Sequence, residues 1–250
     1  MKNAAEITVR TYSETAIPHL GKIIEKNEAV MVEISEKLVA DVKAGKSLFA
    51  FGSGHAAIFT MELYHRAGGC SFLVPVFADY LLPTAGPPVV RILERTAAAA
   101  NMMLARVEPR AGEMIWISSQ SGINTAVVDF ALEAKRLGLF TVAFTSVEHS
   151  SAVASRHPSG KRLFEVCDRV MDTGGFRGDA CLEIADDVRA GPLSTLGSVM
   201  LGHSILTAAC SRLERDGVRC TYTSVNTPEG EARNKAIEKT AMIRDVLLRG

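Results

Sequence analysis

The sequence has no excess of charge of either sign and no long apolar run. Its 250 residues include 28 Lys and Arg and 28 Asp and Glu, so the formal net charge is zero. Nucleic acids and anionic membranes attract basic surfaces, so this composition favours neither partner. The opening segment, MKNAAEITVR, lacks the apolar core of a signal peptide. No segment approaches the ~18 apolar residues of a membrane span. We therefore expect a cytoplasmic protein that binds neither nucleic acid nor membrane.

Cysteine is scarce, and its spacing follows no recognisable pattern. The five cysteines are odd in number and never form a C-x-x-C pair; they are Cys70, Cys167, Cys181, Cys210 and Cys220. This pattern favours reduced thiols in a cytosolic protein over a disulfide framework. The histidines show no spacing typical of a metal site. We expect no metal and no cofactor.

The order of apolar segments predicts the fold class. Residues 3–43 carry apolar side chains at helical spacing, which predicts one or two N-terminal helices and a helical segment over residues 1–43. Over residues 44–250, short apolar strands alternate with helices, including a long helix at 87–107 and C-terminal helices at 193–217 and 228–248. This alternation predicts a three-layer αβα domain with a mainly parallel, doubly wound sheet of five strands. Ligands bind such sheets beyond the carboxyl ends of the strands.

The first strand ends in a glycine turn, FGSGHAA, at residues 51–57. Ser53, Gly54 and His55 bring a hydroxyl, a flexible backbone and an imidazole to the start of a helix, where anions bind readily. The turn is not a Walker A loop, because no G-K-[ST] follows, and it is not a G-x-G-x-x-G fingerprint. A ligand site and a purely structural turn both remain open.

The third strand ends in SSQSGIN, residues 118–124, which is rich in hydroxyls. A tight loop at Gly122 can place the hydroxyls of Ser119 and Ser121 around an anion beside a helix N-terminus. In the alternative, Ser121 or Asn124 simply caps the helix. No G-x-S-x-G nucleophile elbow is present, which argues against an α/β-hydrolase.

Together, FGSGH and ISSQSGIN resemble the two loops of the SIS (sugar isomerase) domain superfamily, over roughly residues 45–220. ELYHRAGG, LEAKRLGLFTVAFTS, GDACLEI and GPLSTLG further resemble a bacterial branch of that superfamily labelled phosphoheptose isomerase. The resemblance implies the SIS fold, a sugar-phosphate ligand, and phosphate contacts from Ser119 and Ser121. It does not settle the reaction.

Three features, one in each loop and one at the start of a helix, depart from the patterns of the superfamily or match them only in part. Asn124 lies where phosphoheptose isomerases usually have Ser or Thr, and Ala56 replaces a serine of the first loop. Ser194 and Thr195 resemble the S-T helix start of other SIS enzymes. The lysine that follows this helix start in the glucosamine-6-phosphate synthase branch is absent, since position 196 is a leucine. We therefore expect the second loop to dominate phosphate binding.

Aldose–ketose isomerisation moves a proton between neighbouring carbons and needs a base and a proton donor. Our candidates are His55 at the first helix N-terminus, Glu62 on the helix that follows, and His157 in the Ser-rich segment 146–163. A solvated carboxylate at position 62 and a structured surface loop around position 157 are the alternatives.

Two classes of function fit these residues. The first is a sugar-phosphate aldose–ketose isomerase, with an amino-sugar-phosphate etherase or lyase as a variant. The second is a non-catalytic phosphosugar sensor. Because SIS proteins build sites at subunit boundaries, the resemblance also implies a homodimer or homotetramer, with residues 17–43 and 193–215 near the contacts.

Overall fold

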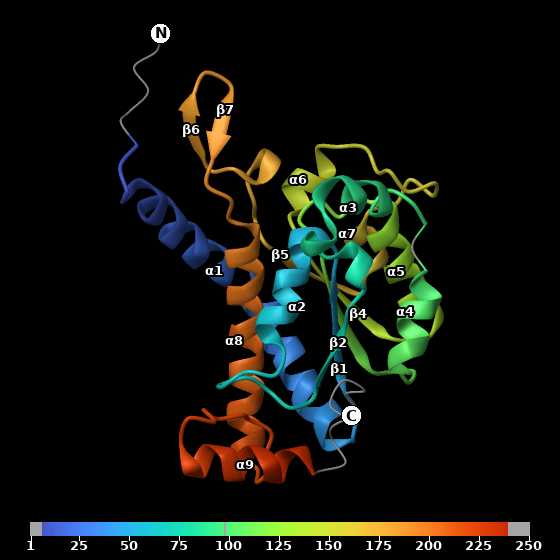
Figure 1. The fold of residues 1–250 in the computed structure, drawn as a ribbon, viewed down its shortest axis with the longest axis vertical. Helices are drawn as coiled ribbons and strands as arrows, with labels where there is room; N and C mark the ends of the chain where they lie inside the picture. The colour runs from blue at the N-terminus through green and yellow to red at the C-terminus, as the bar shows by residue number, and fades with distance from the viewer. Residues whose placement is uncertain (1–6, 98, 240–250) are drawn as a thin grey trace.

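A computed structural model describes residues 7–97 and 99–239. Its centre is a five-stranded sheet in the order β2-β1-β3-β4-β5, in which every neighbouring pair is parallel (Figure 1). The strands are β1 (Leu48–Gly52), β2 (Leu73–Val76), β3 (Met114–Ser118), β4 (Phe140–Thr145) and β5 (Arg169–Asp172). This confirms the predicted parallel sheet of five strands.

Helices cover both faces of the sheet. On one face lie α1 (Thr11–Lys43), α2 (Ala57–Leu63) and α8 (Ser194–Arg215); on the other lie α4 (Ala100–Val107), α5 (Thr125–Arg136) and α7 (Leu163–Val166). Successive strand residues point to opposite faces, so Ala50 and Trp116 pack with the first group while Phe51 and Ile117 pack with the second. Both faces are apolar, as a covered parallel sheet requires. The predicted three-layer architecture is confirmed.

The N-terminal helical segment is one helix. α1 packs along α8, and its Ile23, Ile34 and Leu38 are buried in the same core as β1 and β3. The division into residues 1–43 and 44–250 stays a prediction.

The structure differs from the sequence analysis in two segments. The helix predicted at 87–107 was wrong: the segment forms α3 (Pro87–Leu93) and α4, because α3 turns toward the first glycine loop while α4 packs on β2 and α5. The sequence analysis also missed a hairpin of β6 (Leu182–Ala185) and β7 (Val188–Ala190).

Two shorter helices complete the description. α6 (Val147–Ser151) lies in the Ser-rich segment 146–163. The final helix, α9, spans Pro228–Glu238, and the part predicted at 240–248 lies outside the described residues. Within the part of the chain that the structure describes, no helix is long and apolar enough to cross a membrane.

Candidate functional site

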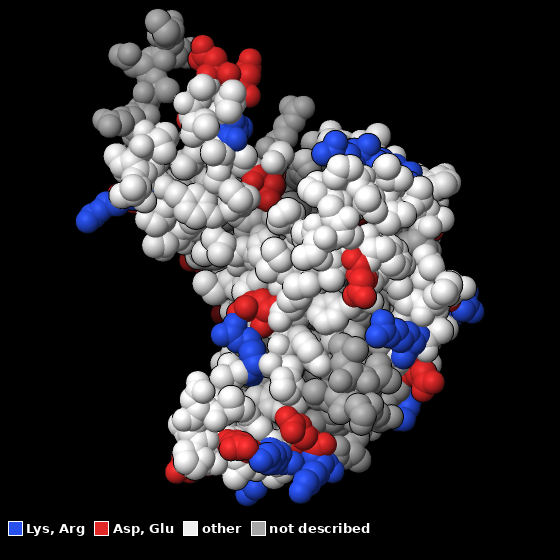
Figure 2. Space-filling model, in the orientation of Figure 1, with Lys and Arg blue, Asp and Glu red and all other residues white. Residues whose placement is uncertain are grey.

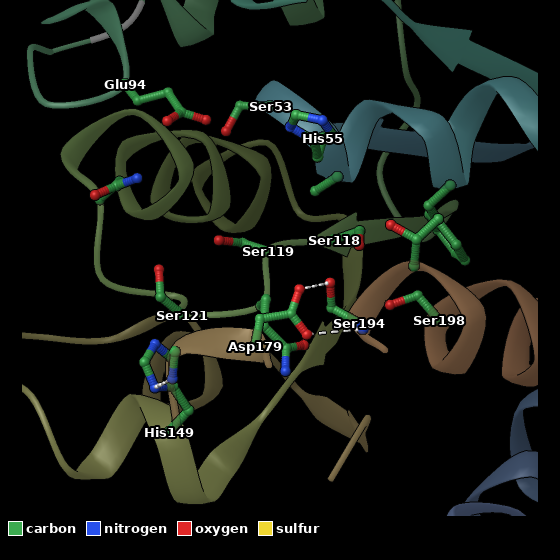
Figure 3. Close-up of a pocket in the computed structure, with 16 residues that line it drawn as sticks. Ser53, His55, Glu94, Ser118, Ser119, Ser121, His149, Asp179, Ser194 and Ser198 are labelled. Carbon is green, nitrogen blue, oxygen red and sulfur yellow. Dashed lines mark hydrogen bonds between the residues drawn. The ribbon is translucent and has the colours of Figure 1, made fainter. Parts of the chain in front are cut away.

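A pocket of about 300 Å³ lies at the carboxyl ends of β1 and β3 (Figure 3). It brings together most of the predicted site residues, which are far apart in the sequence. Those that line it are Ser53, His55, Ser119, Ser121, Asn124, Ser194 and Thr195. Gly54 and Gly122 belong to the loops that shape it.

The first loop follows β1 and continues as a short 3₁₀ turn, Gly54–Ala56, before α2. Ser53 and His55 line the pocket from this loop. Gly54 has a φ of +57°, and a Cβ atom at this position would lie 2.7 Å from Oε1 of Glu94. Glycine is therefore required here both by the backbone conformation and by the close approach of a carboxylate.

Glu94 is the principal residue that the sequence analysis missed. It follows α3, its backbone carbonyl accepts a hydrogen bond from the N–H of Ala126 in α5 (3.1 Å), and its side chain lies over the first loop. Burial raises the pKa of the Glu94 carboxyl, against the hydrogen bond with Ser53 and the positive charge of Arg156, which lower it. A carboxyl with a raised pKa in a pocket is a candidate general acid or base. In the sequence, Glu94 lies inside the helix predicted at 87–107, so no local pattern distinguishes it from an ordinary helical residue.

The second loop connects β3 to α5. The hydroxyl oxygen of Ser119 accepts a hydrogen bond from the N–H of Gly122 (3.2 Å), which leaves the Ser119 O–H free to donate into the pocket. Gly122 has a φ of +59°, and a Cβ atom there would lie 2.9 Å from Oγ1 of Thr145. The Ser121 hydroxyl has no hydrogen-bond partner among the described residues. Both serines are thus available to a ligand.

The N-terminus of α5 meets this loop without a side-chain cap. Asn124 is the N-cap residue, but neither it nor Ser121 makes a side-chain hydrogen bond to the first turn. The Oδ1 atom of Asn124 instead accepts a hydrogen bond from Nη1 of Arg156 (2.6 Å). The alternative in which Ser121 or Asn124 caps the helix is therefore wrong. The positive end of the helix dipole remains uncovered by side chains beside the serines.

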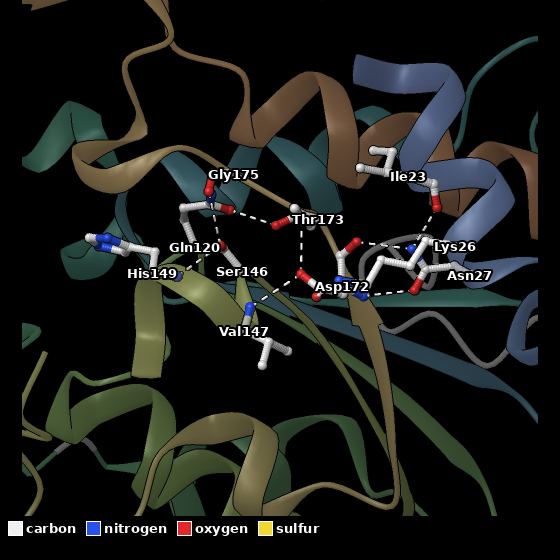
Figure 4. A network of polar contacts seen from close by, with 11 residues as sticks. Ile23, Lys26, Asn27, Gln120, Ser146, Val147, His149, Asp172, Thr173 and Gly175 are labelled. Atoms are coloured by element: carbon white, nitrogen blue, oxygen red, sulfur yellow. Dashed lines mark hydrogen bonds and ion pairs between the residues drawn. The ribbon is translucent and has the colours of Figure 1, made fainter. Parts of the chain in front are cut away.

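A buried polar network fixes the second loop to α1 (Figure 4). The Oε1 atom of Gln120, which lines the pocket, accepts a hydrogen bond from the hydroxyl of Thr173 (2.8 Å). The neighbouring Asp172 exchanges two backbone hydrogen bonds with the amide of Asn27 in α1, at 2.8 and 2.9 Å. Its carboxylate also accepts from the N–H of Gly174 (2.9 Å). The N-terminal helix therefore supports the second loop through the end of β5.

The third wall of the pocket comes from α6 and the start of α8. His149 lines it from α6, and its Nδ1 accepts a hydrogen bond from the N–H of Gly178 (3.4 Å). Asp179 lines it from the loop that precedes the β6–β7 hairpin, and Ser194 and Thr195 line it from α8. The sequence analysis selected neither His149 nor Asp179 as a site residue.

Two predicted catalytic residues are not brought into the pocket. Glu62 lies one helical turn beyond the pocket-lining Phe59, where its carboxylate pairs with Arg66 and with His203. The side chain of Glu62 is 38% exposed there. The structure does not support a catalytic role for this carboxylate.

His157 has a structural role in the segment 146–163. Its Nε2 lies 2.8 Å from Oδ1 of Asp129 on α5, and its Nδ1 lies 2.6 Å from the Ser159 hydroxyl. Its side chain is only 9% exposed. These contacts hold a structured surface loop against α5, so the predicted catalytic role of His157 is not supported.

The pocket lining is rich in hydroxyls and poor in positive charge. It includes the carboxylates Glu94 and Asp179 but no lysine or arginine. On the face seen in Figure 2, Lys and Arg form small separate groups with wide uncharged areas between them. Among the described residues, no three His, Cys, Asp or Glu side chains are grouped so that they could hold a metal ion. Binding of an anion here would rest on hydroxyls, backbone N–H groups and helix dipoles.

Comparisons with known proteins agree with this architecture. A family model for the SIS domain matches residues 11–146. The UPF0309 protein of Shouchella clausii is 34% identical over 232 residues, 92% of this chain and 94% of that protein. The UPF0309 protein of Oceanobacillus iheyensis is 31% identical over 234 residues, with the same coverage of 92% and 94%. A solved phosphoheptose isomerase from Francisella tularensis shares the fold, with a TM-score of 0.52 and 14% identity over 80% of this chain and 95% of that one.

Proposed function

Because the chain belongs to the SIS domain family, we propose that its pocket binds a sugar phosphate and interconverts an aldose and a ketose. The observation that carries this proposal is the position of Glu94. A half-buried carboxyl with a raised pKa lies in the same pocket as an uncapped helix N-terminus flanked by free serine hydroxyls. The carboxyl suits proton transfer, and the helix N-terminus with its serine hydroxyls suits the binding of an anion.

The second loop anchors the phosphate. The hydroxyls of Ser119 and Ser121 donate hydrogen bonds to its oxygens, and the positive end of the α5 dipole stabilises its charge. No lysine or arginine lines the pocket, so the phosphate is held without a direct ion pair. This favours reversible binding of a ligand that must leave after the reaction.

The first loop and Glu94 carry the proton transfer. The Glu94 carboxylate removes the proton from the carbon beside the carbonyl group and returns it to the former carbonyl carbon. His55 lies near enough to Glu94 to lower the pKa of that carboxyl. It donates a proton to the carbonyl oxygen and accepts one from the neighbouring hydroxyl. The intermediate between the two steps is an enediol. Ser53 favours the ionised form of this carboxyl, because its hydroxyl lowers the pKa of Glu94.

We also expect the chain to form a homodimer or homotetramer. A groove between α1 and α8 is lined by Met31, Val32 and Ile205, with Glu36 on one helix and Arg212 on the other. An apolar groove with an acidic side chain on one wall and a basic side chain on the other suits a second copy related by a two-fold axis. Sedimentation at micromolar concentration measures this, and a clean monomer would contradict it.

A ligand screen followed by a reaction assay tests the proposed function. Pentose, hexose and heptose phosphates are screened by thermal shift, and each ligand that stabilises the protein is incubated in D₂O and followed by NMR. An isomerase incorporates deuterium at the carbon beside the carbonyl and forms the isomeric sugar. Stabilisation without exchange or cleavage would indicate the phosphosugar sensor instead. Cleavage products would indicate the lyase or etherase.

A further inference from the structure

The N-terminus of α8 already holds a carboxylate inside the pocket. The Oδ1 atom of Asp179 accepts hydrogen bonds from the N–H groups of Leu193 (3.2 Å) and Ser194 (2.9 Å). Its Oδ2 atom accepts one from the hydroxyl of Ser194 at 2.5 Å (Figure 3). These three donors, at the positive end of a helix of 22 residues, form a site whose geometry fits a carboxylate.

Two buried serines beside this site have no partner. Ser118 and Ser198 are only 2% and 4% exposed, and both line the pocket. Neither hydroxyl makes a hydrogen bond to any residue in the described ranges. Figure 3 shows Ser198 beside Ser194 on α8, with Ser118 on the adjoining wall. Both hydroxyls therefore keep their hydrogen-bonding capacity for a group in the pocket, and Ser198 does so beside the start of α8.

Asp179 and a bound phosphate oppose each other. Both lie in one pocket of about 300 Å³, and no lysine or arginine lines the space between them. Like charges that share one small pocket destabilise each other. A ligand carboxylate can use the α8 donors only in a state in which Asp179 has left them, and that state keeps two anionic groups in the pocket rather than three. Gly178, directly before Asp179, has a φ of +76° and no atom within 4 Å of where a Cβ atom would lie, so the packing there leaves room for a change of backbone conformation.

We infer that the start of α8 is a carboxylate subsite, held by Asp179 in the free protein and taken over by the ligand. Leu193, Ser194 and Ser198 supply its donors. The ligand class is a sugar that carries a phosphate at one end and a carboxylate at the other, a phosphorylated sugar acid. This inference rests on the proposed phosphate site, since the second loop must hold the other end of the ligand. It narrows the substrate class that the proposed function leaves open.

Two variants at position 179 test the inference against a matched control. Asp179→Asn and Asp179→Ala both remove the charge, but the asparagine oxygen can still accept hydrogen bonds from the α8 N–H groups, whereas alanine vacates them. Calorimetry measures the affinity of each for glucose 6-phosphate and for 6-phosphogluconate. We expect Asp179→Ala to bind 6-phosphogluconate at least ~10-fold more tightly than Asp179→Asn, as hydrogen bonds to a charged group allow. The two variants should bind glucose 6-phosphate within about 2-fold of each other.

Ser198→Ala in the otherwise unchanged chain gives an independent test that does not alter the helix cap. It should weaken binding of 6-phosphogluconate by about 5-fold and leave glucose 6-phosphate unchanged, since one hydrogen bond to the carboxylate is lost. Circular dichroism and thermal melting check that each variant is folded. Equal changes for both ligands in both sets of variants would overturn the carboxylate subsite while leaving the phosphate site intact. If neither ligand bound any folded variant, the proposed phosphate site would itself be overturned.

Discussion

The loops after β1 and β3 end neighbouring strands of one sheet, yet they bring different chemistry to the pocket. The first loop, with Glu94 lying over it, holds the titratable groups His55 and Glu94. The second loop contributes only neutral hydroxyls and amides beside the N-terminus of α5. Under the proposed function, this difference assigns binding and proton transfer to separate loops. A phosphate held by neutral donors does not add a fixed positive charge beside the carboxyl.

The largest expected effect on the reaction rate comes from Glu94, which lies over the first loop. Glu94→Gln keeps the shape of the side chain but removes the base, so kcat for isomerisation should fall by about 10²–10⁴-fold. The KM for the sugar phosphate should stay within about 3-fold, because the phosphate anchor is untouched. Steady-state rates and deuterium exchange measure both quantities. A variant that kept kcat within 3-fold of the wild type would show that Glu94 is not the base.

A smaller effect is expected from the second loop. Ser121→Ala removes a donor to a charged oxygen and should weaken sugar-phosphate binding by about 10-fold. His55→Ala should change the dissociation constant by less than about 3-fold, since it does not contact the phosphate, while still lowering kcat. Isothermal calorimetry compares the two variants. Equal affinities of wild type and Ser121→Ala would remove the distinction between the loops.

The pH profile sharpens the comparison further. Glu94 must be ionised to act as a base, and burial raises its pKa, so the acid limb of kcat/KM should lie above that of an ordinary carboxyl. The hydrogen bond from Ser53 favours the ionised form, so Ser53→Ala should raise the pKa of Glu94 and move this limb to higher pH. Ser13→Ala, at an exposed position of α1 outside the pocket, is the control and should leave the limb in place. A limb that moved to lower pH in Ser53→Ala would contradict the assignment.

The smallest effect should come from Glu62. Its carboxylate pairs with Arg66 and His203 away from the pocket, so Glu62→Gln should keep kcat within about 2-fold. The same kinetic assay, beside a melting curve, measures it. A large loss of kcat in a folded variant would show that Glu62 takes part in catalysis.

The local pattern of apolar residues and glycines in the sequence was enough to predict the parallel sheet and the two glycine turns. The alternation of apolar strands and helices predicted the parallel sheet, and the turns at residues 51–57 and 118–124 lie side by side because parallel strands end at one edge. Gly138 has a φ of +76° just beyond the last turn of α5, a conformation in which glycine commonly ends a helix. These features depend on residues close together in the chain.

Other features depend on contacts between distant segments. The break between α3 and α4 has no local cause in an alanine-rich segment; it follows from α3 bringing Glu94 to Gly54 and Ala126. Asp179 meets Ser194 across an unpredicted hairpin. Glu62 and His157 looked suitable by residue type, but the direction of their helix and loop gives them other partners.

The sequence alone therefore determined the layers of the fold and the two loops that line the pocket, because hydrophobic periodicity and glycine turns act over a few residues. Only the tertiary structure decided which carboxylates face the pocket. Glu94 reaches it from the end of α3, where Ser53, Ala126 and Arg156 lie more than 30 residues away in the chain. Asp179 reaches it from the loop before the β6–β7 hairpin, and its partners Leu193 and Ser194 lie 14 and 15 residues away. Burial sets the protonation behaviour of a carboxyl, and burial is a property of the packed molecule rather than of the chain.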